Sequence, residues 1–241
     1  MKKNNSIHQQ QLFDNGFSVM ENIYSEEEIQ NILTIIDQTD SSNETFRKTN
    51  DLFAIRQFLR EIPTVIDLIF TENLKSVMKE IIGGDFFVVK SIYFDKPETS
   101  NWYVPYHQDL TISVDKKMEI KNFELWTTKQ NQFAVHPPIE FLENITTIRI
   151  HLDDTDENNG ALRVVPKSHL KKMYRTETID WNKEIETICR VKKGGIMLMK
   201  PLTLHSSKRT TNNKKRRVIH IEFSNRELPN ELNWAERINL N

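Results

Sequence analysis

The chain contains little of what forms covalent cross-links or membrane anchors. Cys189 is the single cysteine in 241 residues, so a disulfide within the chain is excluded. No apolar run approaches the ~20 residues that a membrane-spanning helix requires. Lys2 and Lys3 resemble the start of a secretory leader, but the polar stretch 4–11 follows where an apolar segment would be needed. We therefore expect a reducing, cytoplasmic location.

An excess of one charge is missing as well. The 33 basic and 34 acidic residues give a net charge of −1, which does not favour binding to nucleic acid or to a membrane surface. The short basic run 214–217 is the one local exception. Hydrophobic residues make up 37% of the chain, which is typical of a globular protein with a sizeable core. The length predicts one domain, 1–241.

The first third of the chain, about 1–84, has mainly helical patterns. Ser25 and Glu28 have the spacing of a capping box, and apolar residues at helical spacing predict a helix from Ser25 to about Asp37. A polar loop is expected at 39–50. Further helix is expected at 64–82, where two glycines follow.

From about 85 to 241 the pattern is typical of strands. We expect them at 86–94, 145–152, 161–165, 196–199 and 218–223. The turn residues Asn158-Asn159-Gly160 predict that the strand after them returns as a hairpin. Helices first and many short strands afterwards favour an antiparallel β core with peripheral helices.

Two His-x-Asp pairs occur, His107-Gln108-Asp109 and His151-Leu152-Asp153. On a strand or at its edge, such a pair places an imidazole and a carboxylate on one face because the strand period is two. A mononuclear iron centre with open positions for co-substrate and dioxygen binds the metal through two imidazoles and one carboxylate. A third ligand must therefore come from a distant strand.

The two pairs differ in their surroundings. The pair at 151–153 leads into the acidic turn 153–156, where solvated carboxylates are expected. The pair at 107–109 follows an aromatic segment, 101–106, and precedes a long irregular stretch, 111–143. Long stretches of this kind are often lids over a site. This context favours the pair at 107–109.

His205 is a candidate for the third ligand. Arg216 lies 11 positions after it and could bind a carboxylate through two parallel N–H bonds. Because Arg217 follows directly, strand parity points one of the two arginines away, and we prefer Arg216. His151 and Arg163 have a similar spacing, so spacing alone leaves both pairs open.

Several ordered motifs extend over nearly the whole chain. They are 13–17 (Phe-Asp-Asn-Gly-Phe), 94–97 (Phe-Asp-Lys-Pro), 105–110 (Pro-Tyr-His-Gln-Asp-Leu), 159–162 (Asn-Gly-Ala-Leu), 166–169 (Pro-Lys-Ser-His), 205–207 (His-Ser-Ser) and 216–217 (Arg-Arg). In this order they resemble the phytanoyl-CoA dioxygenase family of iron(II) and 2-oxoglutarate oxygenases, and 126–138 resembles a bacterial subset of it. The resemblance implies a double-stranded β-helix, a jelly-roll or cupin-like barrel, with the site in its mouth.

The resemblance also implies a role for each matching residue. His107, Asp109 and His205 match the iron ligands, and no catalytic residue beyond them is implied. The residues that match contacts of 2-oxoglutarate are Arg216, Ser207, Ile92, Arg56 and Arg149. Some members have tryptophan where this chain has Arg149. The implied reaction uses Fe(II), 2-oxoglutarate and O2, and hydroxylates a small molecule with release of succinate and CO2.

Some interpretations stay open at this point. Trp126, Gln108 and Tyr103 are candidate substrate contacts, although Trp126 and Tyr103 are equally typical of a lid core. His220 shares the strand parity of Arg216 and could line the same cavity. Two alternative functions are a non-catalytic jelly-roll metal-binding protein and a metal enzyme that does not use 2-oxoglutarate. Arg216 argues against the second, which has no use for a buried carboxylate clamp.

Overall fold

The computed structural model describes residues 2–39, 46–48, 53–98, 100–129, 132–229 and 231–240. Most of the loop expected at 39–50 therefore lies outside the described residues. The helices are α1 (Lys2–Asn15), α2 (Glu26–Asp37), α3 (Phe58–Glu61), α4 (Ile66–Ile69), α5 (Glu72–Ile81) and α6 (Ile139–Asn144), with 3-10 turns η1 (Pro63–Val65), η2 (Ser168–Lys171) and η3 (Thr176–Thr178). Within these ranges, none of the helices has both the length and the apolar composition needed to cross a membrane.

The strands form three antiparallel sheets. They are β1 (Phe17–Met20), β2 (Phe46–Lys48), β3 (Phe53–Arg56), β4 (Phe87–Lys96), β5 (Val104–His107), β6 (Ile112–Val114), β7 (Glu124–Lys129), β8 (Gln132–His136), β9 (Thr146–His151), β10 (Leu162–Val164), β11 (Thr187–Ile188), β12 (Ile196–Met199), β13 (His205–Ser207), β14 (Arg216–Ser224) and β15 (Ile238–Asn239). The eight-stranded sheet has the order β1-β12-β9-β14-β4-β3-β2, with β15 beside β4. A four-stranded sheet has the order β11-β10-β13-β5, and a three-stranded sheet has the order β6-β8-β7.

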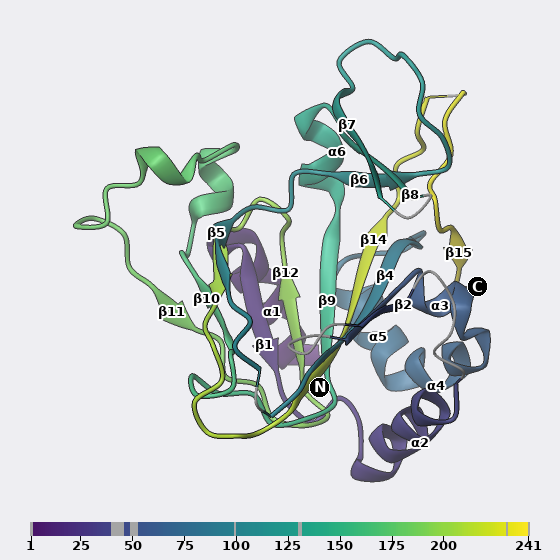
Figure 1. Ribbon diagram of the computed structural model, residues 1–241, viewed down its shortest axis with the longest axis vertical. Coiled ribbons are helices and arrows are strands. Elements are labelled where there is room, and N and C mark those ends of the chain that lie inside the picture. Colours follow the sequence, from purple (N-terminus) through teal and green to yellow (C-terminus); the bar gives the residue numbers. More distant parts are fainter. Residues whose placement is uncertain are drawn as a thin grey trace.

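The elements are arranged in layers around the large sheet. Figure 1 shows α2, α3, α4 and α5 gathered on one side of this sheet, with β5 and β10 of the four-stranded sheet on the other side. The three-stranded sheet and α6 lie together at one end of the molecule. This is the mainly β arrangement, with helices outside, that the sequence predicts.

Helices cover the outer face of the large sheet because their apolar faces match it. The predicted capping box begins α2, since Ser25 accepts from the amide of Glu28 and the Glu28 carboxylate accepts from the amide of Ser25. The buried side chains of α2 and α5 pack with the outward-facing residues of β9 and β14 in one core cluster. Those strand residues are Ile148, Ile150, Ile219, Ile221 and Phe223.

The inner face of the same strands is polar. Because side chains alternate along a strand, the neighbours of those apolar residues point between the two sheets. Arg149 on β9 is directly opposite His220 on β14, and His220 is directly opposite Ile92 on β4. Polar residues inside a fold need partners or ligands, so this face is where a functional site is expected.

The prediction that 161–165 returns as a hairpin beside the preceding strand is wrong. Gly160 does make a tight turn with φ +87, and a Cβ there would lie 2.8 Å from the carbonyl oxygen of Lys208. However, β10 pairs with β11 and β13, whereas β9 pairs with β12 and β14. The chain therefore crosses from the large sheet to the four-stranded sheet after Gly160.

Two further regions are more ordered than the sequence suggests. The mainly helical region 1–84 also contributes β1, β2 and β3, which join the large sheet. The stretch 111–143, expected to be irregular, contains the three-stranded sheet and α6. Short strands with mixed polar residues give little periodic signal, which is why the sequence pattern did not reveal them.

Candidate metal centre and keto-acid pocket

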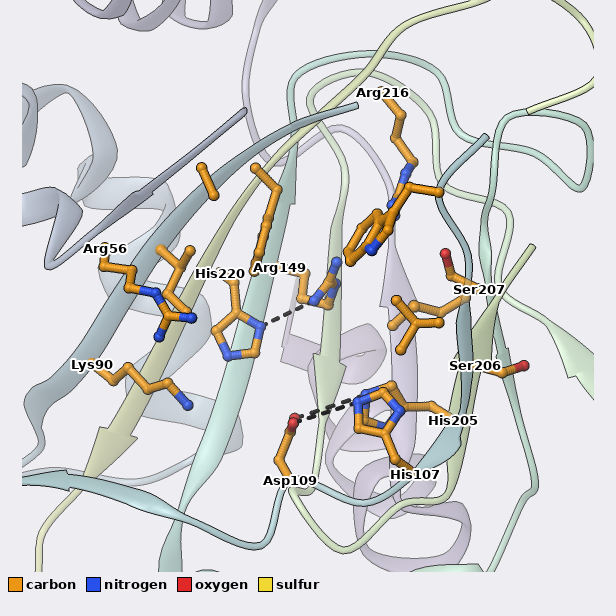
Figure 2. Close-up of a pocket in the computed structure, with 16 residues that line it drawn as sticks. Arg56, Lys90, His107, Asp109, Arg149, His205, Ser206, Ser207, Arg216 and His220 are labelled. Carbon is orange, nitrogen blue, oxygen red and sulfur yellow. Dashed lines mark hydrogen bonds and ion pairs between the residues drawn. The ribbon is translucent and has the colours of Figure 1, made fainter. Parts of the chain in front are cut away.

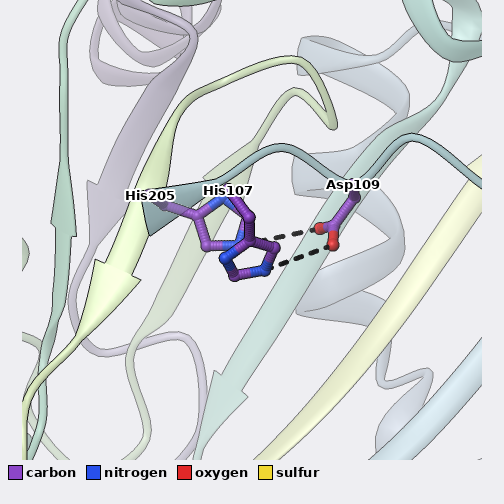
Figure 3. Close-up of side chains that lie close together, drawn as sticks. All are labelled: His107, Asp109 and His205. Atoms are coloured by element: carbon purple, nitrogen blue, oxygen red, sulfur yellow. Dashed lines mark ion pairs between the residues drawn. The ribbon is translucent and has the colours of Figure 1, made fainter. Parts of the chain in front are cut away.

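Three predicted ligands from two segments of the chain meet between the sheets. His107 ends β5 and His205 begins β13, and the two residues are directly paired across these strands. Their imidazole centroids lie 4.2 Å apart. The Asp109 carboxylate oxygens lie 3.8 Å from Nε2 of His107 and 3.8 Å from Nε2 of His205. Figure 3 shows the three side chains turned toward one another.

Backbone carbonyls fix the orientation of both imidazoles. Nδ1 of His107 lies 2.9 Å from the carbonyl oxygen of Pro105, and Nδ1 of His205 lies 2.9 Å from that of Thr203. A carbonyl can only accept, so each Nδ1 carries the proton and each Nε2 keeps its lone pair. Both lone pairs then face the Asp109 carboxylate, as metal-binding histidines with such outer partners do. The arrangement fits a divalent iron ion.

The protonation states suit metal binding. Burial lowers the pKa of His205 to about 4, although Asp109 opposes this shift, so the imidazole is neutral near pH 7. Burial alone would raise the pKa of Asp109, but His205, Lys90, His220 and His107 together hold it well below its ordinary value. A neutral imidazole and an ionised carboxylate are the forms that bind a cation.

The second His-x-Asp pair does not converge. Nδ1 of His151 bonds to the hydroxyl of Thr155 at 2.8 Å. The Asp153 carboxylate instead binds Arg217, with Nη2 to Oδ1 at 2.7 Å and Nε to Oδ2 at 2.9 Å. Among the described residues, neither side chain joins a group that could hold a metal ion. The same ion pair shows that Arg217 points away from the cavity, as preferred from strand parity.

A cavity of about 250 Å³ opens beside the three ligands. Figure 2 shows it between the two sheets, with Asp109 and the two histidines at one end and Arg216 at the other. Its described lining residues are Ala54, Arg56, Lys90, Ile92, Phe94, Trp102, Val104, His107, Asp109, Arg149, Leu162, His205, Ser206, Ser207, Arg216 and His220. The cavity thus joins the candidate metal centre to a set of cationic side chains.

Arg216 and Ser207 have polar atoms without partners in this cavity. Arg216 is only 4% exposed, yet its Nε and Nη1 have no hydrogen-bond partner among the described residues, and neither has the Ser207 hydroxyl. A buried guanidinium without a partner is costly. A carboxylate that accepts from the Arg216 guanidinium and from the Ser207 hydroxyl would satisfy part of this donor set. The residues present therefore fit 2-oxoglutarate, with its far carboxylate at Arg216.

Comparison with known sequences agrees with this geometry. The model of the family described as phytanoyl-CoA dioxygenase (PhyH) matches residues 13–218. The chain belongs to the phytanoyl-CoA dioxygenase family. The predicted family is thus confirmed, and its match includes all three candidate ligands and Arg216.

A curated relative has a more specific description than the family. It is the probable alpha-ketoglutarate-dependent hypophosphite dioxygenase of Stutzerimonas stutzeri, 24% identical over 196 residues. The match covers 76% of this chain and 59% of the relative. The chain therefore spans about three-fifths of the length of the relative.

Solved structures of non-haem, 2-oxoglutarate-dependent enzymes share the fold. The epimerase SnoN in complex with Fe3+, alpha ketoglutarate and nogalamycin RO has a TM-score of 0.67 at 10% identity, over 93% of this chain and 84% of that one. EctD from S. alaskensis with 2-oxoglutarate and 5-hydroxyectoine has a TM-score of 0.67 at 16% identity, over 91% and 75%. The predicted jelly-roll fold of the phytanoyl-CoA dioxygenase family is confirmed.

The remaining residues predicted to contact 2-oxoglutarate all line the cavity. Ile92, Arg56 and Arg149 come from β4, β3 and β9. Nη1 of Arg149 lies 3.0 Å from Nδ1 of His220, and Nε of Arg149 has no partner among the described residues. The structure therefore leaves Arg149 with a donor for an anionic ligand.

The three predicted substrate contacts are not among the described lining residues of the cavity. The Gln108 amide donates to the carbonyls of Lys172 and Leu202 and accepts from the amide of Tyr174. Tyr103 is 54% exposed. Trp126 donates to a backbone carbonyl and packs against a separate core cluster. Contact of these residues with substrate remains a prediction without geometric support.

A connected row of polar side chains on the cavity wall was not predicted from the sequence. The Lys90 ammonium lies 2.7 Å from the Glu222 carboxylate, which lies 3.1 Å from Nε2 of His220. Arg149 can only donate to Nδ1 of His220, so Nε2 carries the proton and donates to Glu222. Both nitrogens of His220 therefore have partners, and in the close group of Asp109, His220 and Glu222 the hydrogen bond described joins His220 to Glu222. Lys90 lies on the same face of β4 as Ile92, and Glu222 lies on the same face of β14 as Arg216, because an even number of positions separates each pair. This spacing was the signal in the sequence that could have identified Lys90 and Glu222.

Proposed function

We propose that this protein is an iron(II)- and 2-oxoglutarate-dependent dioxygenase that hydroxylates a small molecule and releases succinate and CO2. The observation that carries this proposal is a single cavity with three converging metal-ligand side chains at one end. At the other end lies Arg216, whose Nε and Nη1 have no hydrogen-bond partner among the described residues. We extend the proposal to the whole chain, 1–241, as one catalytic domain in a cytoplasmic setting.

Each region of the cavity would have a separate task. His107, Asp109 and His205 would bind iron(II) on one side and leave the side facing the cavity open. When bound, the iron would supply the activation of dioxygen and the oxidation of the substrate. Arg216 and Ser207 would bind the far carboxylate of 2-oxoglutarate and aim its keto end at the metal centre. The apolar side chains of Ile92, Phe94 and Leu162 in the cavity lining would exclude water.

The alternatives explain less of the cavity. A non-catalytic metal-binding protein needs the three ligands but has no need of a buried guanidinium without a partner. A metal enzyme that does not use a keto acid has no need of it either. Since an unpaired buried charge lowers stability, its presence favours a function that uses it. The keto-acid co-substrate provides that function.

The proposal is tested by 2-oxoglutarate binding and by succinate release. Binding is titrated anaerobically with iron(II) present, and succinate is then measured in air over a panel of small metabolites. Hypophosphite, the compound in the name of the relative, is the first to include. We expect binding in the wild type and its loss in Arg216→Ala. A wild type that holds iron(II) but does not bind 2-oxoglutarate would overturn the proposal.

A further inference from the structure

Gln108 separates two of the candidate metal ligands in the sequence, but its side chain does not lie beside them. His107 and Asp109 line the cavity and turn toward His205 (Figure 3), whereas Gln108 is not among the described lining residues. Because side chains alternate along an extended chain, the one between two inward-facing residues points away from the cavity. Gln108 is nevertheless only 9% exposed. A buried carboxamide needs partners for its polar atoms, and those partners indicate what Gln108 does.

The Gln108 carboxamide joins three segments of the chain. Its Nε2 donates to the carbonyl of Leu202 at 2.5 Å and to the carbonyl of Lys172 at 2.7 Å. Its Oε1 accepts from the backbone amide of Tyr174 at 2.8 Å. Both N–H donors are therefore used, and none is left for a substrate. These bonds instead fix where the segment 107–109 lies relative to the two other segments.

Leu202 belongs to a tight turn that also orients the other metal ligands. The turn 200–203 is closed by a hydrogen bond of 2.9 Å from the amide of Thr203 to the carbonyl of Lys200. Three successive carbonyls of this turn accept hydrogen bonds from the two metal-binding segments. In chain order, the carbonyls of Pro201, Leu202 and Thr203 accept from the amide of Asp109, from Nε2 of Gln108 and from Nδ1 of His205. Of the two side chains among these donors, only that of Gln108 is not itself a candidate ligand, so it can be changed while all three ligands are kept.

The third segment contains a residue in an unusual backbone conformation. Lys172 has φ +58° and ψ −128°, which costs free energy for a residue other than glycine. Its carbonyl accepts from Gln108, and two residues further on the amide of Tyr174 donates to Gln108. Strained conformations persist where surrounding contacts fix them, and they gather at functional sites. The bonds of Gln108 are contacts of this kind, and they connect the strained segment directly to the ligand segment 107–109.

We propose that Gln108 is a positioning residue for the metal centre. Its carboxamide holds the segment 107–109 against the turn 200–203, so that His107, Asp109 and His205 can contact one ion. This inference rests on the proposed function and adds a residue to its metal site. Ligands act together only when they are held within about 0.5 Å of the right geometry. Groups that orient ligands therefore affect metal affinity without touching the metal.

The experiment compares metal affinity and folding stability in variants of the full chain. Gln108→Met removes three hydrogen bonds and keeps a side chain of similar length. Gln9→Met is the matched control, because Gln9 also donates to two backbone carbonyls of a distant segment, those of Glu80 and Ile81. Iron(II) binding is titrated anaerobically by calorimetry, and denaturant unfolding of the metal-free protein measures stability. A second titration uses cobalt(II), whose visible absorption depends on the geometry of its ligands.

A further variant separates positioning from folding. Lys172→Gly relieves the strained conformation, because glycine adopts positive φ without a steric penalty, and the Lys172 side chain is exposed. The double variant Gln108→Met/Lys172→Gly should therefore regain part of the stability that Gln108→Met loses. It still lacks the carboxamide that holds the ligand segment, so its metal affinity should not recover. This variant also replaces the single one if Gln108→Met fails to fold.

We expect Gln108→Met to weaken iron(II) binding roughly ten-fold or more and to change the visible spectrum of bound cobalt(II). The double variant should show the same loss of affinity and the same altered spectrum. Gln9→Met and Lys172→Gly should bind iron(II) with wild-type affinity and give the wild-type cobalt(II) spectrum, even where Gln9→Met lowers the free energy of unfolding.

Two results would overturn the inference. One is a wild-type iron(II) affinity and cobalt(II) spectrum in Gln108→Met. The other is recovery of wild-type iron(II) affinity in the double variant, which would mean that Gln108 affects the metal only through overall stability. A wild type that holds iron(II) but does not bind 2-oxoglutarate would instead overturn the proposed function alone, because these titrations need no keto acid. A wild type that binds neither metal ion would overturn both.

Discussion

The two His-x-Asp pairs have the same residue types at the same spacing, but only one builds a site. Each begins with the last residue of a strand, His107 on β5 and His151 on β9. Beyond β5, Asp109 turns back toward His107 and the facing His205. Beyond β9, Asp153 is bound by Arg217 of the neighbouring strand instead. The partner across the sheet, and not the motif, decides what each aspartate does.

The comparison also separates two kinds of arginine. Arg216 and Arg217 are adjacent, so they leave β14 on opposite faces. Arg217 has a carboxylate partner within the protein, whereas Nε and Nη1 of Arg216 have no hydrogen-bond partner in the part of the chain that the structure describes. A charged side chain that is already paired stabilises the fold, and one without a partner is available to a ligand. The predictions below test this contrast, in order of decreasing effect.

The largest expected effect is on the metal. His107→Ala, Asp109→Ala and His205→Ala each remove one of three ligands and should weaken iron(II) binding by roughly 100-fold or more. The measurement is an anaerobic iron(II) titration followed by calorimetry. His151→Ala and Asp153→Ala are the matched variants of the other pair and should bind iron(II) like the wild type. If His205→Ala bound iron(II) with wild-type affinity, these three residues would not be the metal centre.

The second effect concerns 2-oxoglutarate. Arg216→Ala should lower its affinity by about 2–5 kcal/mol, because it removes one partner of a buried, charge-assisted pair. Lys214→Ala removes an exposed charge nearby and should change the affinity by less than ~1 kcal/mol. Without ligand, Arg216→Ala should fold at least as stably as the wild type, because an unpaired buried charge is lost. A large loss in Lys214→Ala would mean that general surface charge, rather than the cavity, attracts the keto acid.

Much of the fold could be predicted from local signals. The capping box at Ser25 and the alternation along 145–152 are short-range patterns, and both are present in the structure. The hairpin after Gly160 was predicted wrongly because turn residues show that the chain reverses, but not which strand it then joins. Pairing between distant strands depends on the packing of the whole chain, which no local pattern contains.

The candidate site was only partly predictable for a related reason. Family motifs identified the three ligands and Arg216, which the structure brings to one cavity. They gave no indication of Lys90, because its place in the cavity depends on strands that lie far from it in the sequence. Gln108 is one of the candidate substrate contacts predicted from the sequence. Its amide is instead bonded to the backbone of distant segments, as alternation along the chain allows.

The third prediction is that His205 and His151 make the stability of the metal-free protein depend on pH in the same way. Burial lowers the pKa of His205 to about 4 from 6.5 and lowers that of His151 well below 6.5. The unfolded chain therefore binds more protons than the folded one below pH 6.5, and the free energy of unfolding falls as pH decreases through this window. We expect a loss of about 1–2 kcal/mol per histidine between pH 7 and pH 5.

Denaturant unfolding of the metal-free protein at several pH values measures this loss. His205→Asn and His151→Asn should each flatten the dependence by a similar amount, because neither asparagine titrates. With iron(II) bound, only the wild type and His151→Asn should gain stability. A pH dependence that is unchanged in both variants would mean that other groups cause the loss of stability in acid.

The smallest effect concerns the ion pair of the non-converging motif. Asp153 and Arg217 are 20% and 19% exposed and form two parallel hydrogen bonds, a geometry better than that of most surface pairs. We expect Asp153→Asn and Arg217→Met each to lower the free energy of unfolding by about 1 kcal/mol. The double variant should lose less than the sum of the two, because the interaction is removed only once. Affinities for iron(II) and 2-oxoglutarate should stay at the wild-type values in all three. If Asp153→Asn weakened iron binding instead, the two motifs would be energetically linked, and the separation between a structural aspartate and a metal-binding one would not hold.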